Sequence, residues 1–264
     1  MGLERGRGDE VNGCDKCDGM MWVPSVDDQG RTYAKPCDCL EEGRVNRYLR
    51  AAKIPDSFAH VELDNYETDF LGCTARQKQA VFMVRKFAQK TVAETGSAGI
   101  ILTGNCGSGK THLAVGLLKH LMREQRRTGI FYASSRLLEV IKSTYDRDDL
   151  NEWDVMEPVV TRNILVLDDL GSGRLTEYVQ EKIAYILGER YDRKLTTIIT
   201  TNYVFAEPTQ TPEAIASGQQ KKLTLGDCVG DRAFSRLQEM CLVVPVEGPD
   251  FRATIRKAST LNML

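Results

Sequence analysis

The sequence predicts an α/β fold, a three-layer core in which helices cover both faces of a central parallel sheet of five strands. Short apolar runs of strand length alternate with longer segments that repeat apolar residues at helical spacing. A glycine-rich loop separates the first of these strands from the next helix, and two pairs of cysteines crowd the start of the chain. We therefore expect one large α/β domain preceded by a small cysteine-rich module.

The composition is typical of a globular protein. The chain has 264 residues, of which 42% are hydrophobic and 27% charged, and its net charge of -2 does not attract it to nucleic acid or to an anionic membrane. The first dozen residues lack the apolar stretch of a signal peptide, and no apolar run approaches the roughly 18 residues of a membrane-spanning helix. We expect a cytoplasmic protein with no membrane partner, whose eight cysteines bind metal or remain thiols.

The predicted elements follow one another in the order of such a fold. Residues 1–48 lack long periodic segments and form the cysteine-rich module, residues 49–95 form a linker with an amino-terminal helix, and residues 96–264 form the main domain. Apolar runs bounded by turn residues predict strands at 100–102, 130–133, 163–167, 196–201 and 242–246. Helical spacing predicts helices at 46–52, 74–92, 113–122, 136–145, 176–193 and 227–240, and a polar stretch predicts a loop at 206–226.

The glycine-rich loop carries the strongest functional signal. It matches the phosphate-binding pattern GxxxxGK[ST] in the required context, after a strand and before a helix, which disfavours a chance glycine turn. Backbone N–H groups of such a loop point at phosphate oxygens, and the helix N-terminus adds partial positive charge. We expect Lys110 to reach the β- and γ-phosphates of ATP and the Thr111 hydroxyl to bind Mg²⁺. The loop residues are Gly104, Asn105, Cys106, Gly107, Ser108, Gly109, Lys110 and Thr111.

Polar residues end two later strands of the predicted sheet. The strand at 163–167 runs into Asp168 and Asp169, and a buried strand has little reason to end in two carboxylates unless they meet a cation. We expect Asp168 to hold the Mg²⁺ water shell and Asp169 to orient the attacking water; capping of the next helix is the alternative. Asn202 follows the strand at 196–201 and would lie at the same sheet edge, near the γ-phosphate, unless it is only a turn residue.

The cysteine-rich module predicts a zinc site. Cys14 and Cys17 form a CxxC knuckle, and Cys37 and Cys39 supply two more thiolates about 20 residues later. Four cysteines suit tetrahedral Zn²⁺. Because the second pair is CxC and not CxxC, free thiols or a redox pair remain the alternative.

The order of these motifs resembles the AAA+ ATPases, and specifically the DnaC/DnaI helicase loaders and the IstB transposition helpers. The resemblance spans roughly residues 50–252. It is carried by GNCGSGKTH, which extends the nucleotide-binding loop to His112, by ILVLDDLG, ITTN and GDRAFSRL, and by the earlier segment IPDSFAHVELDNY.

The resemblance implies further roles for polar residues. Asn202 would be the first sensor, and GDRAFSRL would supply an arginine finger that acts on the ATP of a neighbouring subunit, with Arg236 our first choice and Arg232 the second. Arg252 in PDFR resembles the second sensor arginine, which contacts nucleotide in its own subunit. From sequence alone these arginines could equally be solvated surface charges. Many relatives have Glu where this chain has Asp169, whose shorter side chain implies slow turnover.

The resemblance also implies a path for single-stranded DNA. Relatives thread the strand past residues that follow the acidic strand, here Arg174, Thr176 and Tyr178, and past the end of the preceding helix, here Tyr145. An aromatic ring can stack on a base and an arginine can bind a phosphate. The alternative is that both tyrosines only pack on helix surfaces.

The sequence thus predicts an ATPase that requires Mg²⁺ and forms ATP-dependent oligomers. By resemblance, it would load a DnaB-type replicative helicase onto single-stranded DNA, with the cysteine-rich module contacting the helicase. Two alternatives remain open: an IstB-type helper of DNA transposition, and a nucleotide-dependent adaptor with little hydrolysis. A P-loop kinase acting on a small molecule is a more distant possibility.

Overall fold

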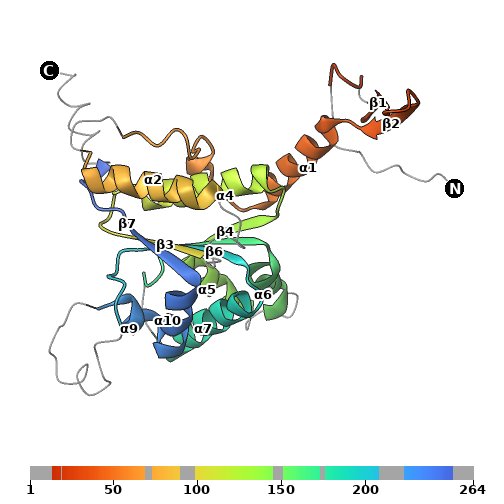
Figure 1. The fold of residues 1–264 in the computed structure, drawn as a ribbon. Helices are drawn as coiled ribbons and strands as arrows, with labels where there is room; N and C mark the ends of the chain where they lie inside the picture. The colour runs from red at the N-terminus through yellow and green to blue at the C-terminus, as the bar shows by residue number, and fades with distance from the viewer. Residues whose placement is uncertain are drawn as a thin grey trace, which may run out of the picture.

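A five-stranded parallel sheet forms the centre of the protein (Figure 1), as the sequence predicts. The computed structural model describes residues 14–18, 20–68, 73–89, 99–144, 151–172, 176–207 and 223–251. The strand order across the sheet is β4-β5-β6-β3-β7, and every pairing is parallel. The strands are β3 (Gly99–Thr103), β4 (Gly129–Ala133), β5 (Ile164–Asp168), β6 (Thr196–Thr201) and β7 (Cys241–Pro245).

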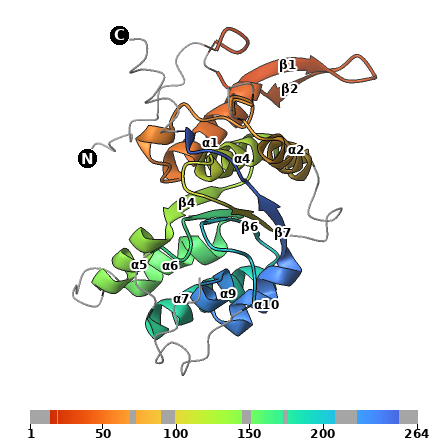
Figure 2. The ribbon, with the colours of Figure 1, turned by 90° about the vertical axis from the view of Figure 1, so that its left-hand side faces the viewer.

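Helices cover both faces of this sheet (Figures 1 and 2) and bury every residue of β3 and β6 and the first four residues of β5. In β3, Ile100 and Leu102 belong to the core on one face, whereas Ile101 belongs to the core on the other, as the two-residue period of a strand requires. On the first face lie α1 (Asp38–Ala51), α2 (Ala75–Gln89) and α4 (Lys110–Glu124). On the second lie α5 (Ser134–Ser143), α6 (Glu152–Thr161), α7 (Glu177–Asp192), α9 (Leu225–Val229) and α10 (Asp231–Met240).

Two of the predicted helices differ from those in the structure. The helix expected at 46–52 is the end of a longer helix, α1, which starts directly after Cys37 and continues to Ala51. The helix expected at 227–240 is interrupted at Gly230, whose φ of 80° is not helical, and α9 and α10 form on either side of it.

One α-helix and two strands were not predicted at all. Helix α6 begins with a capping box formed by Asn151 and Asp154, but Pro158 inside the helix obscures its signal in the sequence. Within residues 1–48, β1 (Trp22–Val26) and β2 (Thr32–Pro36) form an antiparallel hairpin. Neither hairpin strand has a buried residue, so no apolar alternation marks them in the sequence.

Within the described part of the chain, no helix has the length and apolar character needed to cross a membrane.

A buried guanidinium ties the helices of the second face to the sheet. Arg190 on α7 is fully buried and donates to the carbonyl oxygens of Val159 at 2.7 Å, Arg162 at 3.0 Å and Thr196 at 2.6 Å. These carbonyls belong to the end of α6, the turn after it and the start of β6. Because its N–H groups donate to these carbonyl oxygens, the charged guanidinium is tolerated in the core. Burial nevertheless lowers the pKa of Arg190.

Replacing Arg190 with methionine is therefore expected to destabilise the fold strongly. The substitution leaves three buried carbonyl oxygens without their donor, at about 1 to 3 kcal/mol each, so we expect a loss of at least ~3 kcal/mol in the free energy of unfolding measured in urea. Arg193→Ala is the control: it removes only a partly exposed pair with Glu189 and should cost below about 1 kcal/mol. Equal unfolding midpoints for Arg190→Met and wild type would contradict this assignment.

Candidate nucleotide site and cysteine cluster

The glycine-rich loop between β3 and α4 has backbone angles and surroundings that only glycine tolerates. The φ angles of Gly104, Gly107 and Gly109 are 143°, 74° and 92°. A side chain on Gly104 would overlap the carbonyl group of Val246 at the end of β7. The loop thus curls tightly before α4, whose first residue is Lys110, so its amides and the helix N-terminus face one small volume.

An earlier segment of the chain presses on this loop. The Tyr66 hydroxyl donates to the carbonyl oxygen of Ser108 at 2.9 Å, and a side chain on Gly109 would lie 2.7 Å from the Tyr66 ring. The Tyr66 ring also meets His112 edge-on, with 5.2 Å between ring centroids. His112 in turn lies 3.0 Å from the Asn65 side-chain oxygen through its Nε2. Sequence reasoning placed this segment in the family resemblance but missed the contact of Tyr66 with the loop.

A buried lysine fixes the same segment to α4. Lys119 donates to the carbonyl oxygens of Phe58 at 3.0 Å, Ala59 at 2.7 Å and Val61 at 2.8 Å. Burial lowers the pKa of Lys119, while the nearby Glu62 carboxylate raises it. These carbonyl oxygens lie at the end of a 3-10 turn, Asp56–Phe58, and just after it, so one ammonium ties this segment to α4.

The carboxyl-terminal segment contacts the loop from another side. The Phe251 N–H donates to the Gly107 carbonyl oxygen at 3.1 Å, and the Asp250 carboxylate lies where a side chain on Gly107 would be. The Gln77 side chain of α2 lies where a side chain on Gly248 would be. Its amide donates to the Ser108 carbonyl oxygen at 3.4 Å. The loop is therefore enclosed by three segments that are distant in sequence.

The acidic end of β5 faces the first residues of α4. Asp168 Oδ1 accepts hydrogen bonds from the hydroxyls of Thr111 at 2.9 Å and Thr200 at 2.6 Å. Burial raises the pKa of the Asp168 carboxyl, and these hydrogen bonds lower it in part. A divalent cation at this position would offset the cost of burying the carboxylate, and the oxygen donors of Asp168 and Thr111 are those that Mg²⁺ prefers.

Asp169 and Asn202 lie together at the same sheet edge. The Asn202 side-chain amide donates to Asp169 Oδ1 at 2.8 Å. Asp169 adopts a left-handed conformation with φ of 54°, which its N–H secures by donating to the Thr200 hydroxyl at 2.8 Å. The Ser134 hydroxyl donates to the Asp169 carbonyl oxygen at 2.8 Å. A non-glycine residue held in this conformation is typical of a functional position, and the structure brings the two predicted residues into contact.

The remaining loop groups fit a bound polyphosphate. The Lys110 ammonium donates to the carbonyl oxygens of Gly104 at 2.9 Å and Asn105 at 2.6 Å, so it lies over the loop. The Ser108 hydroxyl is buried and has no hydrogen-bond partner among the described residues. Lys110 and the loop amides could hold the β- and γ-phosphates of ATP, with Thr111 and Asp168 on the side of the metal.

Two of the three predicted arginines lie on a helix of the second sheet face. Arg232 and Arg236 lie on α10, on the sheet face opposite α4 (Figure 1). Arg232 is exposed, whereas Arg236 is half-buried, with its guanidinium 6.0 Å from the centre of the Tyr191 ring. Arg252 lies outside the described residues.

Two of the four residues predicted to contact DNA can be placed. The Thr176 hydroxyl caps α7 by accepting from the Val179 N–H at 3.3 Å, and Tyr178 is half-buried, with the Lys182 ammonium 5.4 Å from its ring centre. Tyr145 and Arg174 lie outside the described residues.

The four amino-terminal cysteines converge on one point, ahead of α1. Their sulfur atoms all lie within 4.8 Å of one another, with Cys14 and Cys37 3.7 Å apart and Cys17 and Cys39 3.5 Å apart. Tetrahedral zinc with Zn–S bonds of about 2.3 Å separates its ligands by about 3.8 Å. Desolvation raises the pKa of Cys17, but hydrogen bonds from Cys39 and from the Met21 amide lower it to about 7, whereas desolvation and the hydrogen bond with Cys17 raise the pKa of Cys39. The cluster therefore fits zinc.

Comparison with known proteins bears out the resemblance in the motifs. The family of IstB-like ATP-binding proteins matches residues 39–259. A crystal structure of the DnaC helicase loader has 30% sequence identity and a TM-score of 0.57, over 72% of this chain and 99% of that one. Among curated proteins, the uncharacterised YqaM of Bacillus subtilis is 26% identical over 70% of this chain and 60% of its own length. The replicative helicase loader DnaI of the same organism is 28% identical over 52% of this chain and 46% of its own.

The geometry of the loop predicts that Gly109→Ala weakens ATP binding. A methyl group at this position would lie 2.7 Å from the Tyr66 ring, and the backbone φ of 92° is strained for alanine. The loop therefore has to move away from Tyr66. Gly43→Ala in α1 is the matched control, since its methyl group meets nothing within 4 Å. Isothermal titration calorimetry with ATP and Mg²⁺ should show at least a tenfold weaker affinity for Gly109→Ala only. Equal affinities would contradict the crowding at Gly109.

Proposed function

This chain belongs to the family of IstB-like ATP-binding proteins, and on that premise we propose that it is an ATP-dependent helicase loader. In this proposal it binds a DnaB-type replicative helicase and single-stranded DNA in the cytoplasm and hydrolyses ATP. The likeness to the DnaC helicase loader, which extends over 99% of that chain at 30% identity, carries the proposal. The chain spans only 60% and 46% of the two curated relatives named above, so their activities enter only as proposals.

The proposed nucleotide chemistry uses residues at the edge of the sheet. Lys110 and the amides of the loop would bind the phosphates, and Thr111 and Asp168 would hold Mg²⁺, whose positive charge would offset the negative charge of the phosphates during hydrolysis. Asp169 orients the attacking water and accepts its proton. The hydrogen bond from Asn202 keeps the Asp169 carboxylate turned toward that water and lets Asn202 sense the γ-phosphate.

Self-association is part of the proposal. Arg236 lies on the sheet face opposite α4, which follows the phosphate loop. An arginine finger from this helix therefore acts on the ATP of a neighbouring copy, where such a residue contributes ~10³ to 10⁵ in rate. Arg252 would contact nucleotide within its own chain, as in the related ATPases.

The amino-terminal part is proposed to bind zinc and the helicase. We assign residues 1–48 to a zinc-binding module, 49–95 to a linker and 96–264 to the ATPase domain. The hairpin projects away from the sheet at the amino-terminal end of α1 (Figure 2) and exposes Trp22, Val26 and Tyr33 to solvent. Such apolar exposure suits a protein partner better than it suits DNA. Single-stranded DNA is assigned instead to Tyr145, Arg174, Thr176 and Tyr178.

Two alternatives have specific support. The family match itself favours an IstB-type helper of transposition, which would recruit a transposase and not a helicase. The short Asp169 side chain favours an adaptor that binds ATP but hydrolyses it little. ATP turnover measured with and without single-stranded DNA separates the adaptor from the loader. The loader should hydrolyse ATP in at least one of the two conditions, whereas the adaptor should bind ATP and hydrolyse little in both.

The loader proposal is tested with the zinc ligands. Purified full-length chain should contain about one zinc per chain and should capture the DnaB-type helicase encoded in the same genome. Cys37→Ser should lose both the zinc and the helicase while keeping ATP affinity, because Cys37 caps the amino-terminal end of α1, from which the hairpin projects away from the sheet (Figure 1). Cys73→Ser is the matched control, since Cys73 lies outside the cluster.

Two outcomes would contradict the proposal in different ways. Helicase capture by a zinc-free Cys37→Ser chain would remove the assigned role of the cysteine-rich module. Capture of a transposase by the wild-type chain, with no capture of the helicase, would favour the IstB-type alternative.

A further inference from the structure

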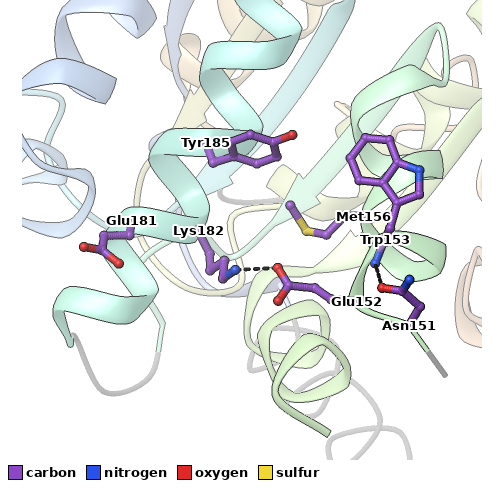
Figure 3. A pocket seen from close by; sticks show the side chains of 7 residues that line it. All are labelled: Asn151, Glu152, Trp153, Met156, Glu181, Lys182 and Tyr185. Carbon is purple, nitrogen blue, oxygen red and sulfur yellow. Dashed lines mark hydrogen bonds and ion pairs between the residues drawn. The ribbon is translucent and has the colours of Figure 1, made fainter. Parts of the chain in front are cut away.

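A hollow between α6 and α7 is not used by the proposed chemistry (Figure 3). Its volume is about 480 Å³, which is large enough for a long side chain with its neighbours. It is lined by Asn151, Glu152, Trp153, Met156, Glu181, Lys182 and Tyr185.

Aromatic rings form the walls of the hollow. Trp153 of α6 is 48% exposed and Tyr185 of α7 is 44% exposed, and the two rings flank the buried Met156. Large aromatic side chains exposed side by side over an apolar floor are typical of a contact surface. Their faces attract cations, and a guanidinium more often than an ammonium.

The charges of the hollow also favour a cationic occupant. Lys182, the one basic side chain among the described residues that line the hollow, is already ion-paired with Glu152 (Figure 3) and lies over the ring of Tyr178. Glu181 is exposed at the rim, one helical turn before Tyr185, and makes no ion pair with any residue that the structure describes. A phosphate group would meet an uncompensated carboxylate here, whereas a guanidinium would be paired.

The opposite flank of α7 presents such a guanidinium. Helix α7 packs on α6 in both of its halves, through Lys182 and through the buried Arg190. Its second half also packs on α10, where the Tyr191 hydroxyl donates to Glu239 at 2.6 Å. Arg232 on α10 is exposed and forms no ion pair among the described residues. In the sheet, β4 and β7 are the two edges, so α6 with α5 lies toward one edge and α10 toward the other.

We infer that Arg232 of one copy inserts into the hollow between Trp153 and Tyr185 of the next copy and pairs with Glu181. Complementary groups on opposite edges of one chain generate head-to-tail association, and a finger acting in trans requires the same arrangement. The inference rests on the proposed self-association and deepens it, because it makes Arg232 a docking residue and leaves Arg236 as the finger.

Charge exchange tests this pairing. With Mg²⁺ and an ATP analogue that resists hydrolysis, sedimentation velocity should show self-association of the full-length wild-type chain. Glu181→Arg and Arg232→Glu should each shift the association midpoint to roughly tenfold higher concentration or more. The double variant, which exchanges the two charges, should regain most of the loss. Trp153→Ala should weaken association with Glu181 intact.

The control and the contrary outcomes are as follows. Glu124→Arg reverses an exposed charge on α4, on the other face of the sheet, and should leave association unchanged. Single variants that associate like the wild type, or a double variant no better than the singles, would overturn the pairing while leaving the proposed function intact. A wild-type chain that stays monomeric would overturn both the pairing and the proposed self-association. Loss of single-stranded DNA binding with unchanged association would reassign the hollow to nucleic acid.

Discussion

The phosphate loop has no space for a side chain at three of its glycines, and this crowding organises the site. Tyr66 contacts Gly109, the end of β7 lies against Gly104, and Asp250 lies against Gly107. Three parts of the chain that are far apart in sequence thus meet on one turn of backbone. A change in the conformation of this loop would therefore require the segments that enclose it to move as well.

The electrostatics of the sheet edge follow from the parallel strands. Because all five strands point the same way, the carboxyl ends of β5 and β6 bring Asp168, Asp169 and Asn202 beside the loop. Asp168 is buried enough that its pKa is raised, and a cation between it and the phosphates would relieve that cost. The arginines of α10 lie on the sheet face opposite α4, so the composite site that we propose would take its finger from another copy.

Local signals in the sequence predicted the sheet, the phosphate loop and the cysteine cluster, because glycine spacing, apolar runs and paired cysteines are short patterns. Contacts between distant residues escaped prediction. Tyr66 and Ser108 are 42 positions apart, and nothing in either segment alone indicates their hydrogen bond. The burial of Arg190 escaped because arginine is usually exposed and only the packing of α6 against β6 supplies its acceptors. Helix α6 escaped because of Pro158.

The central claim is that two copies of the chain complete one ATPase site. Lys110→Ala lacks a working loop and Arg236→Ala lacks a finger, so each variant alone should show almost no turnover. In an equal mixture shown to co-assemble, random pairing joins an intact loop to an intact finger at about a quarter of the interfaces, and turnover should recover to roughly that fraction of the wild-type rate. No recovery in the mixed assembly, or wild-type turnover by Arg236→Ala alone, would contradict the composite site.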